Sequence, residues 1–237
     1  MNNTLLVILP GWGGSHETWQ QFILAAEKDY RVVCIDLPCF GSEPCPTEVW
    51  GVEEYAHFVV KKLQLLRTPV TLLGHSFGGQ VAAYIAATHP ELLNKLILSG
   101  AAAIRPKKYV RRLFLGALAK ISAILFYLPY LRSHEKAIKK LLYTIIQTPD
   151  YGKTSGIQRD IFKRVTREDL RHLLPSITVP TLVVWGRKDR QTPLRHGRTI
   201  AALIPDAKLR IIPDGTHGLH LHHTEQLLQF VHEFIVT

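Results

Sequence analysis

One serine in this chain lies within a glycine-flanked segment, Gly74-His75-Ser76-Phe77-Gly78. A serine hydroxyl is a poor nucleophile unless a nearby base removes its proton and a third group orients that base. The pattern Gly-x-Ser-x-Gly is typical of a nucleophile elbow, a tight turn from a strand into a helix. Residues 70–73 are apolar like a buried strand, and residues 80–87 are small and apolar like a helix. We therefore predict that Ser76 is a nucleophile; the alternative is a glycine-rich turn that only connects a strand to a helix.

An acid and a histidine follow this serine in the order Ser, Asp, His that such sites use. Asp189 comes shortly after the apolar run 181–185, which is typical of a buried strand. His217 follows a second run, 207–212, and is the first of four histidines there that could supply the base. Asp214 is a rival acid, although it lies very near His217 in the sequence. The alternative for Asp189 is a solvated loop carboxylate among arginine and lysine side chains.

Histidines are frequent in this last part of the chain, where His220, His222 and His223 accompany His217. Catalytic zinc takes three fixed protein ligands, and no set of cysteines or carboxylates accompanies these histidines. We therefore expect no metal and no cofactor. The three further histidines are interpreted as part of a solvated or partly buried helix start.

The serine segment, the late acid and histidine, and the glycine-rich segment 9–14 (Leu-Pro-Gly-Trp-Gly-Gly) together resemble the α/β-hydrolase family of serine hydrolases, which includes small carboxylesterases. The resemblance covers nearly the whole chain and is weakest between about 101 and 175. It implies that Ser76, Asp189 and His217 are catalytic. It also implies that the backbone N–H groups of Trp12 and Phe77 form an oxyanion hole, because acyl transfer places negative charge on the attacked oxygen.

Apolar runs and helical patterns alternate along most of the chain. The runs predict strands at 4–9, 31–36, 70–73, 95–99, 181–185 and 207–212, and helices are predicted at 15–26, 52–66, 80–87 and 226–235. This alternation favours an α/β fold, with a mainly parallel sheet of about six strands flanked by helices. By the resemblance, 1–100 and 176–237 form an α/β-hydrolase core, and 101–175 is an inserted helical cap.

The predicted cap contains the chain's excess of positive charge. Residues 101–174 carry +11, whereas the rest of the chain carries −1. Helices are predicted there at 110–130, 136–146, 157–164 and 167–173. Three interpretations stay open: a solvated basic surface, attraction of acidic acyl or phosphate-bearing substrates, and peripheral contact with an anionic membrane. No nucleic-acid partner is expected, because no nucleic-acid-binding motif is present.

Length and composition fit one globular domain with an insertion. The chain has 237 residues, of which 46% are hydrophobic and 20% are charged. Its three cysteines, Cys34, Cys39 and Cys45, lack metal-ligand spacing and are expected to be reduced. No signal peptide and no run long enough to cross a bilayer is evident. We therefore expect a cytoplasmic protein, as a monomer or weak dimer.

The predicted function is cleavage of a carboxylic ester through an acyl-enzyme on Ser76. An acyltransferase, a thioesterase or a C–C bond hydrolase would use the same three residues, because fold and triad are common to these activities. A non-catalytic ligand-binding protein on the same scaffold is the alternative from another class. Such proteins often lack a residue of the triad, and here all three candidates are present.

Overall fold

The computed structural model describes residues 4–105 and 154–237. Within these ranges six strands form a single sheet: β1 (Leu5–Leu9), β2 (Arg31–Cys34), β3 (Val70–His75), β4 (Leu93–Ser99), β5 (Thr181–Gly186) and β6 (Lys208–Ile212). Their order is β2-β1-β3-β4-β5-β6, and every neighbouring pair is parallel. The predicted α/β architecture with a parallel sheet is confirmed.

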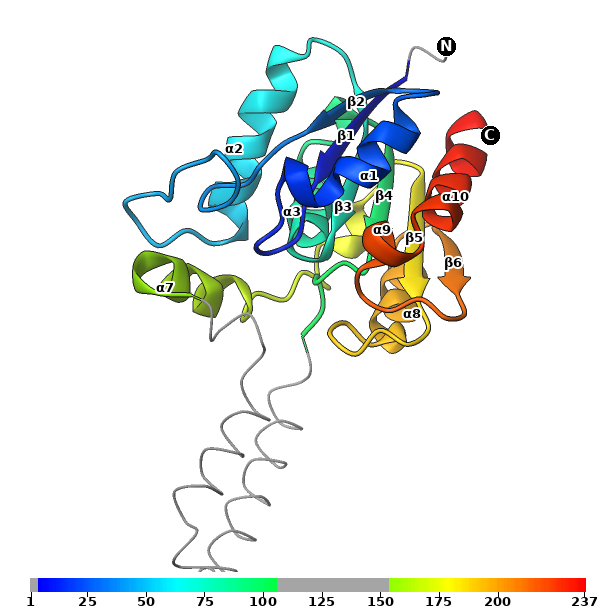
Figure 1. Ribbon diagram of the computed structural model, residues 1–237. Coiled ribbons are helices and arrows are strands. Elements are labelled where there is room, and N and C mark those ends of the chain that lie inside the picture. The colour runs from blue at the N-terminus through cyan, green and yellow to red at the C-terminus, as the bar shows by residue number, and fades with distance from the viewer. Residues whose placement is uncertain (1–3, 106–153) are drawn as a thin grey trace, which may run out of the picture.

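Helices cover both faces of this sheet (Figure 1). They are α1 (His16–Ala26), α2 (Val52–Leu65), α3 (Ser76–Thr88), α7 (Gly156–Val165), α8 (Leu194–Leu203), α9 (Leu219–His222) and α10 (Thr224–Val236), with short 3-10 turns at Pro90–Leu92 and Leu174–Ser176. Helices α2, α3, α7 and α8 contribute to one buried cluster, and α1, α9 and α10 contribute to the other. None of the helices in the described ranges is both long and apolar enough to cross a membrane.

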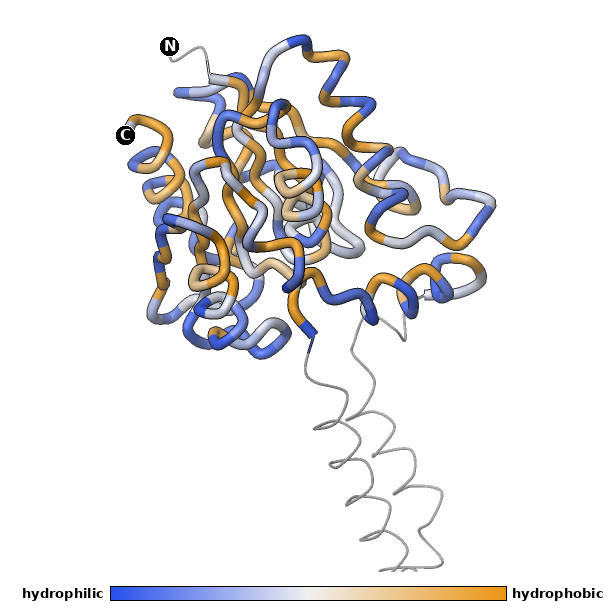
Figure 2. Tube along the Cα trace, turned by 180° about the vertical axis from the view of Figure 1, so that it is seen from behind, coloured by the Kyte–Doolittle hydropathy of each residue, from blue (hydrophilic) through white to orange (hydrophobic). Residues whose placement is uncertain are grey.

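The central strands are largely apolar because both of their faces are buried. Every residue of β1, β3 and β5 is buried, and hydrophobic residues concentrate along these strands in Figure 2. A continuous apolar run of this kind is what a parallel sheet between two helical layers requires. The chain leaves β1 toward β2 on one side and returns to β3 on the other. Residues that follow β1 and β3 therefore meet at the point where the strand order reverses, a common place for a ligand site.

Two parts of the helical prediction differ from the structure. Residues 167–173 form turns and no helix, because the Asp169 carboxylate accepts the backbone N–H of Arg171 at 3.0 Å and that of Arg105 at 3.1 Å. Such local side-chain bonds compete with helix formation. Helix α8 was not predicted from the sequence at all. The short helix expected at 157–164 is confirmed as α7, and the helices expected at 110–130 and 136–146 lie outside the described residues.

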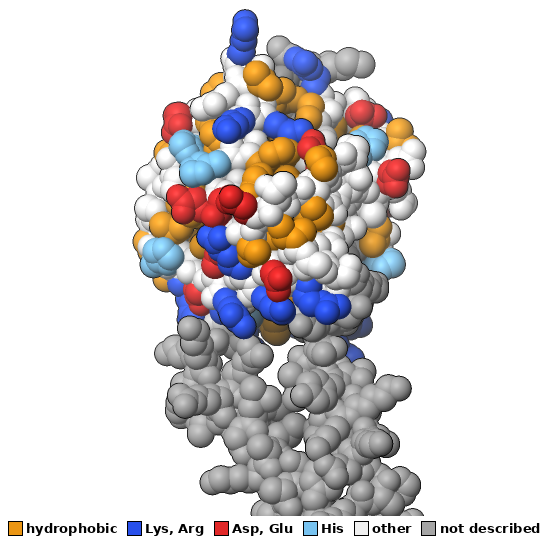
Figure 3. All heavy atoms as spheres, turned by 90° about the vertical axis from the view of Figure 1, so that its left-hand side faces the viewer, with side chains coloured by type: hydrophobic (Ala, Val, Ile, Leu, Met, Phe, Trp, Pro, Cys, Tyr) orange, Lys and Arg blue, Asp and Glu red, His pale blue; other side chains and the backbone are white. Residues whose placement is uncertain are grey.

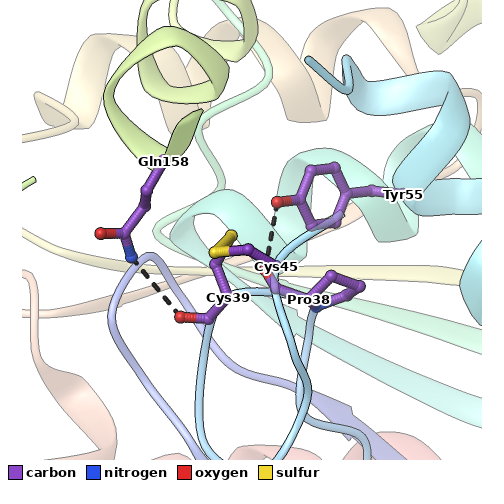
Figure 4. The surroundings of a disulfide bond; sticks show 5 residues. All are labelled: Pro38, Cys39, Cys45, Tyr55 and Gln158. Carbon is purple, nitrogen blue, oxygen red and sulfur yellow. Dashed lines mark hydrogen bonds between the residues drawn. A yellow bond between two sulfur atoms is a disulfide. The ribbon is translucent and has the colours of Figure 1, made fainter. Parts of the chain in front are cut away.

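The expectation of three reduced cysteines is wrong. Cys39 and Cys45 form a disulfide, whereas Cys34 is free. The bond closes a tight loop after β2, in which Cys39 has a positive φ of 77° and its N–H donates to the carbonyl of Pro44. Figure 4 shows two neighbours of this loop: Tyr55 of α2 donates to the Pro38 carbonyl at 3.1 Å, and the Gln158 amide of α7 lies 3.5 Å from the Cys39 carbonyl. Because disulfides are rare in cytosolic proteins, cysteine usage no longer supports the cytoplasmic prediction.

Thiol titration tests this pairing. Without reductant, the unfolded chain should react with one equivalent of a thiol reagent, and after reduction with three. The folded protein should react slowly, because burial raises the pKa of the remaining thiol, Cys34, to about 12 and the thiolate is the reactive form. Three reactive thiols in the unreduced, unfolded chain would contradict the disulfide.

Candidate active site

The turn from β3 into α3 holds Ser76 in a strained conformation. Ser76 is the first residue of α3 and has a φ of 50°, a region that residues with a Cβ seldom occupy. The flanking glycines are required by close contacts. A Cβ on Gly78 would lie 2.2 Å from the carbonyl oxygen of Leu9, and one on Gly74 would lie 2.6 Å from that of Gly78. The sequence motif is therefore a strand-to-helix elbow, with Ser76 at its apex.

The glycine-rich loop after β1 lies directly beside this serine. A Cβ built on Gly11 would approach the Cβ of Ser76 to 3.1 Å. The Trp12 ring packs edge-on against Phe40, Phe77 and Phe162, with centroids 4.9, 5.5 and 4.9 Å away. These three rings come from the disulfide loop, from α3 and from α7. The Trp12 side chain is thus held by rings from three segments, and Phe77, the other predicted oxyanion residue, is one of its contacts.

His217 lies between the serine and the predicted acid. Its Nε2 is 2.9 Å from the Ser76 Oγ, and its Nδ1 is 2.7 Å from an Asp189 carboxylate oxygen. If Nδ1 carries the proton and donates it to Asp189, then Nε2 is free to accept from the serine hydroxyl. The rival acid, Asp214, instead pairs with Lys188 at 2.6 Å on the exposed surface. The structure therefore brings Ser76, His217 and Asp189 together and leaves Asp214 outside.

The Asp189 carboxylate is buried and saturated with hydrogen-bond donors. Its side chain is 1% exposed. One oxygen accepts from the backbone N–H groups of Gln191 and Thr192 at 2.8 and 2.9 Å, and the other lies 2.9 Å from the Thr192 hydroxyl. These bonds fix the carboxylate toward His217. Thr192 was not predicted as part of the site, although the sequence places it three residues after the acid.

Two further histidines, His75 and His220, lie against His217 and were not predicted as site residues. The His75 ring is 4.8 Å from that of His217 and 4.8 Å from that of His220. His220 stacks flat on Trp19, with centroids 4.1 Å apart. Burial, reinforced by the neighbouring histidines, lowers the pKa of His220 to about 4 and that of His75 well below its ordinary value. Both rings are therefore neutral at pH 7.

A cavity of about 720 Å³ opens beside Ser76 and His217. The loop after β1, the start of α1, the loop after β5 and the α9 region surround it. No group of three or more histidine, cysteine or carboxylate side chains in the described parts of the chain could hold a metal ion. A nucleophile, a base and an acid next to a cavity of this size are suited to attack on a carbonyl compound.

This fold and site define a hydrolase scaffold, and comparison with protein families agrees. The model of the alpha/beta hydrolase family matches residues 6–230. The chain therefore belongs to the alpha/beta hydrolase family.

Known relatives extend over nearly the whole chain. It is 28% identical to a pimeloyl-[acyl-carrier protein] methyl ester esterase of Neisseria meningitidis serogroup A, over 96% of this chain and 75% of the relative. It is 27% identical to a 2-hydroxy-6-oxononadienedioate/2-hydroxy-6-oxononatrienedioate hydrolase of a Pseudomonas species, over 95% and 83%. Among solved structures, an esterase from Exiguobacterium antarcticum superposes with a TM-score of 0.74 at 23% identity, over 100% of this chain and 93% of the other. The last comparison supports the fold.

The buried neutral His220 makes folding stability depend on pH. Its pKa is about 4 in the folded protein against an ordinary value of 6.5, so the unfolded chain binds more protons between these two values. The free energy of unfolding should fall as the pH drops from 6.5 toward 4, by up to about 3 kcal/mol from this group. Above pH 6.5 this contribution is fully present.

The variant His220→Phe keeps a ring on Trp19 and removes this titration. Urea unfolding at pH 7 and pH 4.5 should show a smaller loss of stability in this variant than in the wild type. Some loss will persist, because His75 is also buried and neutral. His57 is exposed on α2 and lies outside this histidine cluster, so His57→Gln serves as the control for the loss of a histidine. An equal loss in His220→Phe and wild type would contradict the assignment.

Proposed function

We propose that the protein is a serine hydrolase that cleaves a carboxylic ester, with Ser76 as nucleophile, His217 as base and Asp189 as the acid that orients it. The observation that carries this proposal is the continuous hydrogen-bonded series from the serine hydroxyl through the imidazole to a buried carboxylate, at 2.9 and 2.7 Å. The strained serine conformation supports it, because such strain is concentrated at functional sites. Membership of the alpha/beta hydrolase family supports it independently.

The proposed reaction has two steps through one covalent intermediate. The Ser76 oxygen attacks the ester carbonyl carbon while His217 Nε2 takes the hydroxyl proton. The oxygen of the tetrahedral intermediate accepts hydrogen bonds from the backbone N–H groups of Trp12 and Phe77, each of which contributes about 3 kcal/mol to such reactions. His217 then gives its proton to the leaving alcohol, and an acyl-enzyme remains. Water activated by His217 attacks this acyl group and releases the acid and the free serine.

We also propose that residues 101–175 form a lid over the site, as an insertion in the core formed by 1–100 and 176–237. Support comes from α7, which lies in this segment. Its Phe162 packs on the Trp12 ring, and its Arg164 pairs with Glu54 of α2 at 2.9 Å. The end of the insertion thus contacts both the oxyanion loop and the core. Substrate choice would depend on this lid, while the core supplies the chemistry.

Peripheral membrane contact through the basic lid is a second proposal. Figure 3 shows Lys and Arg side chains along the lower edge of the face that carries α2 and α7. On α7, however, Lys163 pairs with Asp160 at 2.8 Å, and Arg164 pairs with Glu54 and lies 3.6 Å from Glu168. These ion pairs reduce the charge that this helix could offer to an anionic surface.

Removal of the serine hydroxyl tests the mechanism. Ser76→Ala should lower kcat for p-nitrophenyl esters by at least about 1,000-fold, because the covalent route is lost. A fluorophosphonate should label Ser76 in the wild type, as located by peptide mass spectrometry, and should not label the variant. Ser42→Ala, at an exposed position, serves as the control and should behave as the wild type. Unchanged hydrolysis in Ser76→Ala would overturn the proposal.

Ester turnover and fluorophosphonate labelling together also distinguish ester hydrolysis from the other activities that use the same triad. Relatives of this chain include a methyl ester esterase and an oxononadienedioate hydrolase, so oxygen esters and C–C bonds are both candidate targets. We expect turnover of simple oxygen esters with water as the acceptor, with the preferred acyl length reporting the size of the cavity. Fluorophosphonate labelling without hydrolysis of any oxygen ester would favour a C–C hydrolase, thioesterase or acyltransferase. Neither labelling nor turnover would favour a ligand-binding protein.

A further inference from the structure

The cavity beside Ser76 is lined by cationic side chains and by no carboxylate from the described ranges. Lys188 and Arg190 both face it from the loop that follows β5, and no aspartate or glutamate is among its lining residues. An ester needs no positive charge for its binding, because its carbonyl is neutral. The positive charge of the cavity wall therefore suits some other, negatively charged part of the substrate.

Arg190 differs from Lys188, the other cation on the cavity wall, in having no counter-charge among the described residues. Its neighbour Lys188 pairs with Asp214 at 2.6 Å. Arg190 is exposed, and its guanidinium has neither an ion pair nor a hydrogen bond to any residue in the described part of the chain. The adjacent carboxylate, Asp189, is buried and occupied by His217 and by the Thr192 and Gln191 groups. It is not available to neutralise Arg190.

Two of the four histidines on the cavity wall, His75 and His220, do not contribute a fixed charge. His75 and His220 have lowered pKa values because they are buried, and they are neutral at pH 7. The N-terminus of α1 also contributes little positive potential, because the His16 N–H already donates to the Asp36 carboxylate at 2.7 Å. Arg190 and Lys188 are thus the permanently charged cations on the described walls of the cavity.

The loop that carries Arg190 is fixed relative to the reacting groups. The N–H of Lys188 donates to the Gly215 carbonyl at 2.9 Å, and the N–H of Asp189 donates to that of Gly186 at 3.3 Å. The two residues after Arg190, Gln191 and Thr192, donate their N–H groups to the Asp189 carboxylate, which orients His217. The backbone of Arg190 therefore lies at a set position beside the base, and only its side chain is free to reach into the cavity.

We infer that Arg190, assisted by Lys188, binds an anionic group of the substrate, a carboxylate or a phosphate, at a position separate from the ester carbonyl. This inference rests on the proposed function and specifies its substrate class: an ester that carries a second, negatively charged end. Arginine suits this role because its planar guanidinium pairs with both oxygens of a carboxylate or phosphate. Such a contact exists equally in the ground and transition states, so its main effect is on KM.

The test compares esters that differ in charge. Monomethyl adipate and dimethyl adipate are hydrolysed in a pH-stat at low salt, and the ratio of their kcat/KM values gives the selectivity for the anion. Arg190→Gln should lower this ratio about fivefold, through a higher KM for the anionic ester, as expected for a partly exposed charge pair. Arg190→Glu should lower it more. Added salt should reduce the wild-type selectivity, because it screens the interaction.

A matched control lies in the same loop. Arg187 is exposed but does not line the cavity, so Arg187→Gln removes the same net charge without removing the contact. Its selectivity should equal that of the wild type. Equal ratios in all variants, or equal losses in Arg187→Gln and Arg190→Gln, would overturn the inference.

A second pair of esters distinguishes the two kinds of anion. In 2-(phosphonooxy)ethyl hexanoate the charge lies on the alcohol side, and 2-hydroxyethyl hexanoate is its neutral counterpart. If Arg190→Gln lowers the charged-to-neutral ratio of kcat/KM for the adipate esters, the preferred group is a carboxylate. If it lowers that ratio for the hexanoate esters, the preferred group is a phosphate. A loss with neither pair would contradict the inference.

Binding without turnover keeps this question apart from the proposed mechanism. Trp12 and Trp19 line the cavity, so their fluorescence should report titration of the adipate esters into Ser76→Ala. Tighter binding of the monoester than of the diester, lost on adding Arg190→Gln, supports the anion site even if the wild type cleaves no ester. Equal affinity for the two esters would reject the anion site while leaving the serine mechanism intact.

Discussion

The arrangement of the site depends on how closely the start of α3 approaches the end of β1. The backbone at Gly78 passes so near the carbonyls of Leu9 and Pro10 that a single Cβ would lie 2.2 and 2.4 Å from them. This contact sets the position of Ser76 relative to the loop that carries Trp12. It also holds Ser76 at a positive φ, which an isolated turn would not maintain. The parallel pairing of β1 with β3, in which Leu9 lies opposite Gly74, brings the two segments together.

Asp189 links the acid and the base of the site to the sheet in a similar way. Its carboxylate accepts two backbone N–H groups from its own loop and a side-chain N–H from a loop after β6. Neighbouring strands β5 and β6 supply those loops, with Gly186 opposite Ile212 in the register. A buried carboxylate without such donors would be costly, since desolvation disfavours its charge. These donors offset that cost, and because they occupy the carboxylate oxygens they leave it unavailable to the arginine beside it.

Much of this arrangement could be predicted from the sequence because it depends on short, local patterns. The apolar runs that become β1, β3 and β5 are easily recognised, and Ser76 and Asp189 follow two of them; His217 follows the half-exposed strand β6. Helix α8 could not be predicted, because its helical pattern is weak: only Gly197 and Ile200 are buried, and Gly197 is needed where a Cβ would meet the Trp185 ring at 2.5 Å. The disulfide also depends on tertiary structure, since the turn at Cys39 requires a positive φ that its spacing to Cys45 does not reveal.

The neutral histidines around His217 were beyond sequence reasoning for a further reason, and they have a physical consequence for the proposed chemistry. During each step His217 would become an imidazolium, with the His75 ring 4.8 Å away. A second positive charge at that distance would oppose protonation of the base. Burial prevents this, because it holds the pKa of His75 well below its ordinary value and that of His220 at about 4. The charge that develops on His217 is then balanced by the Asp189 carboxylate, 2.7 Å from its Nδ1.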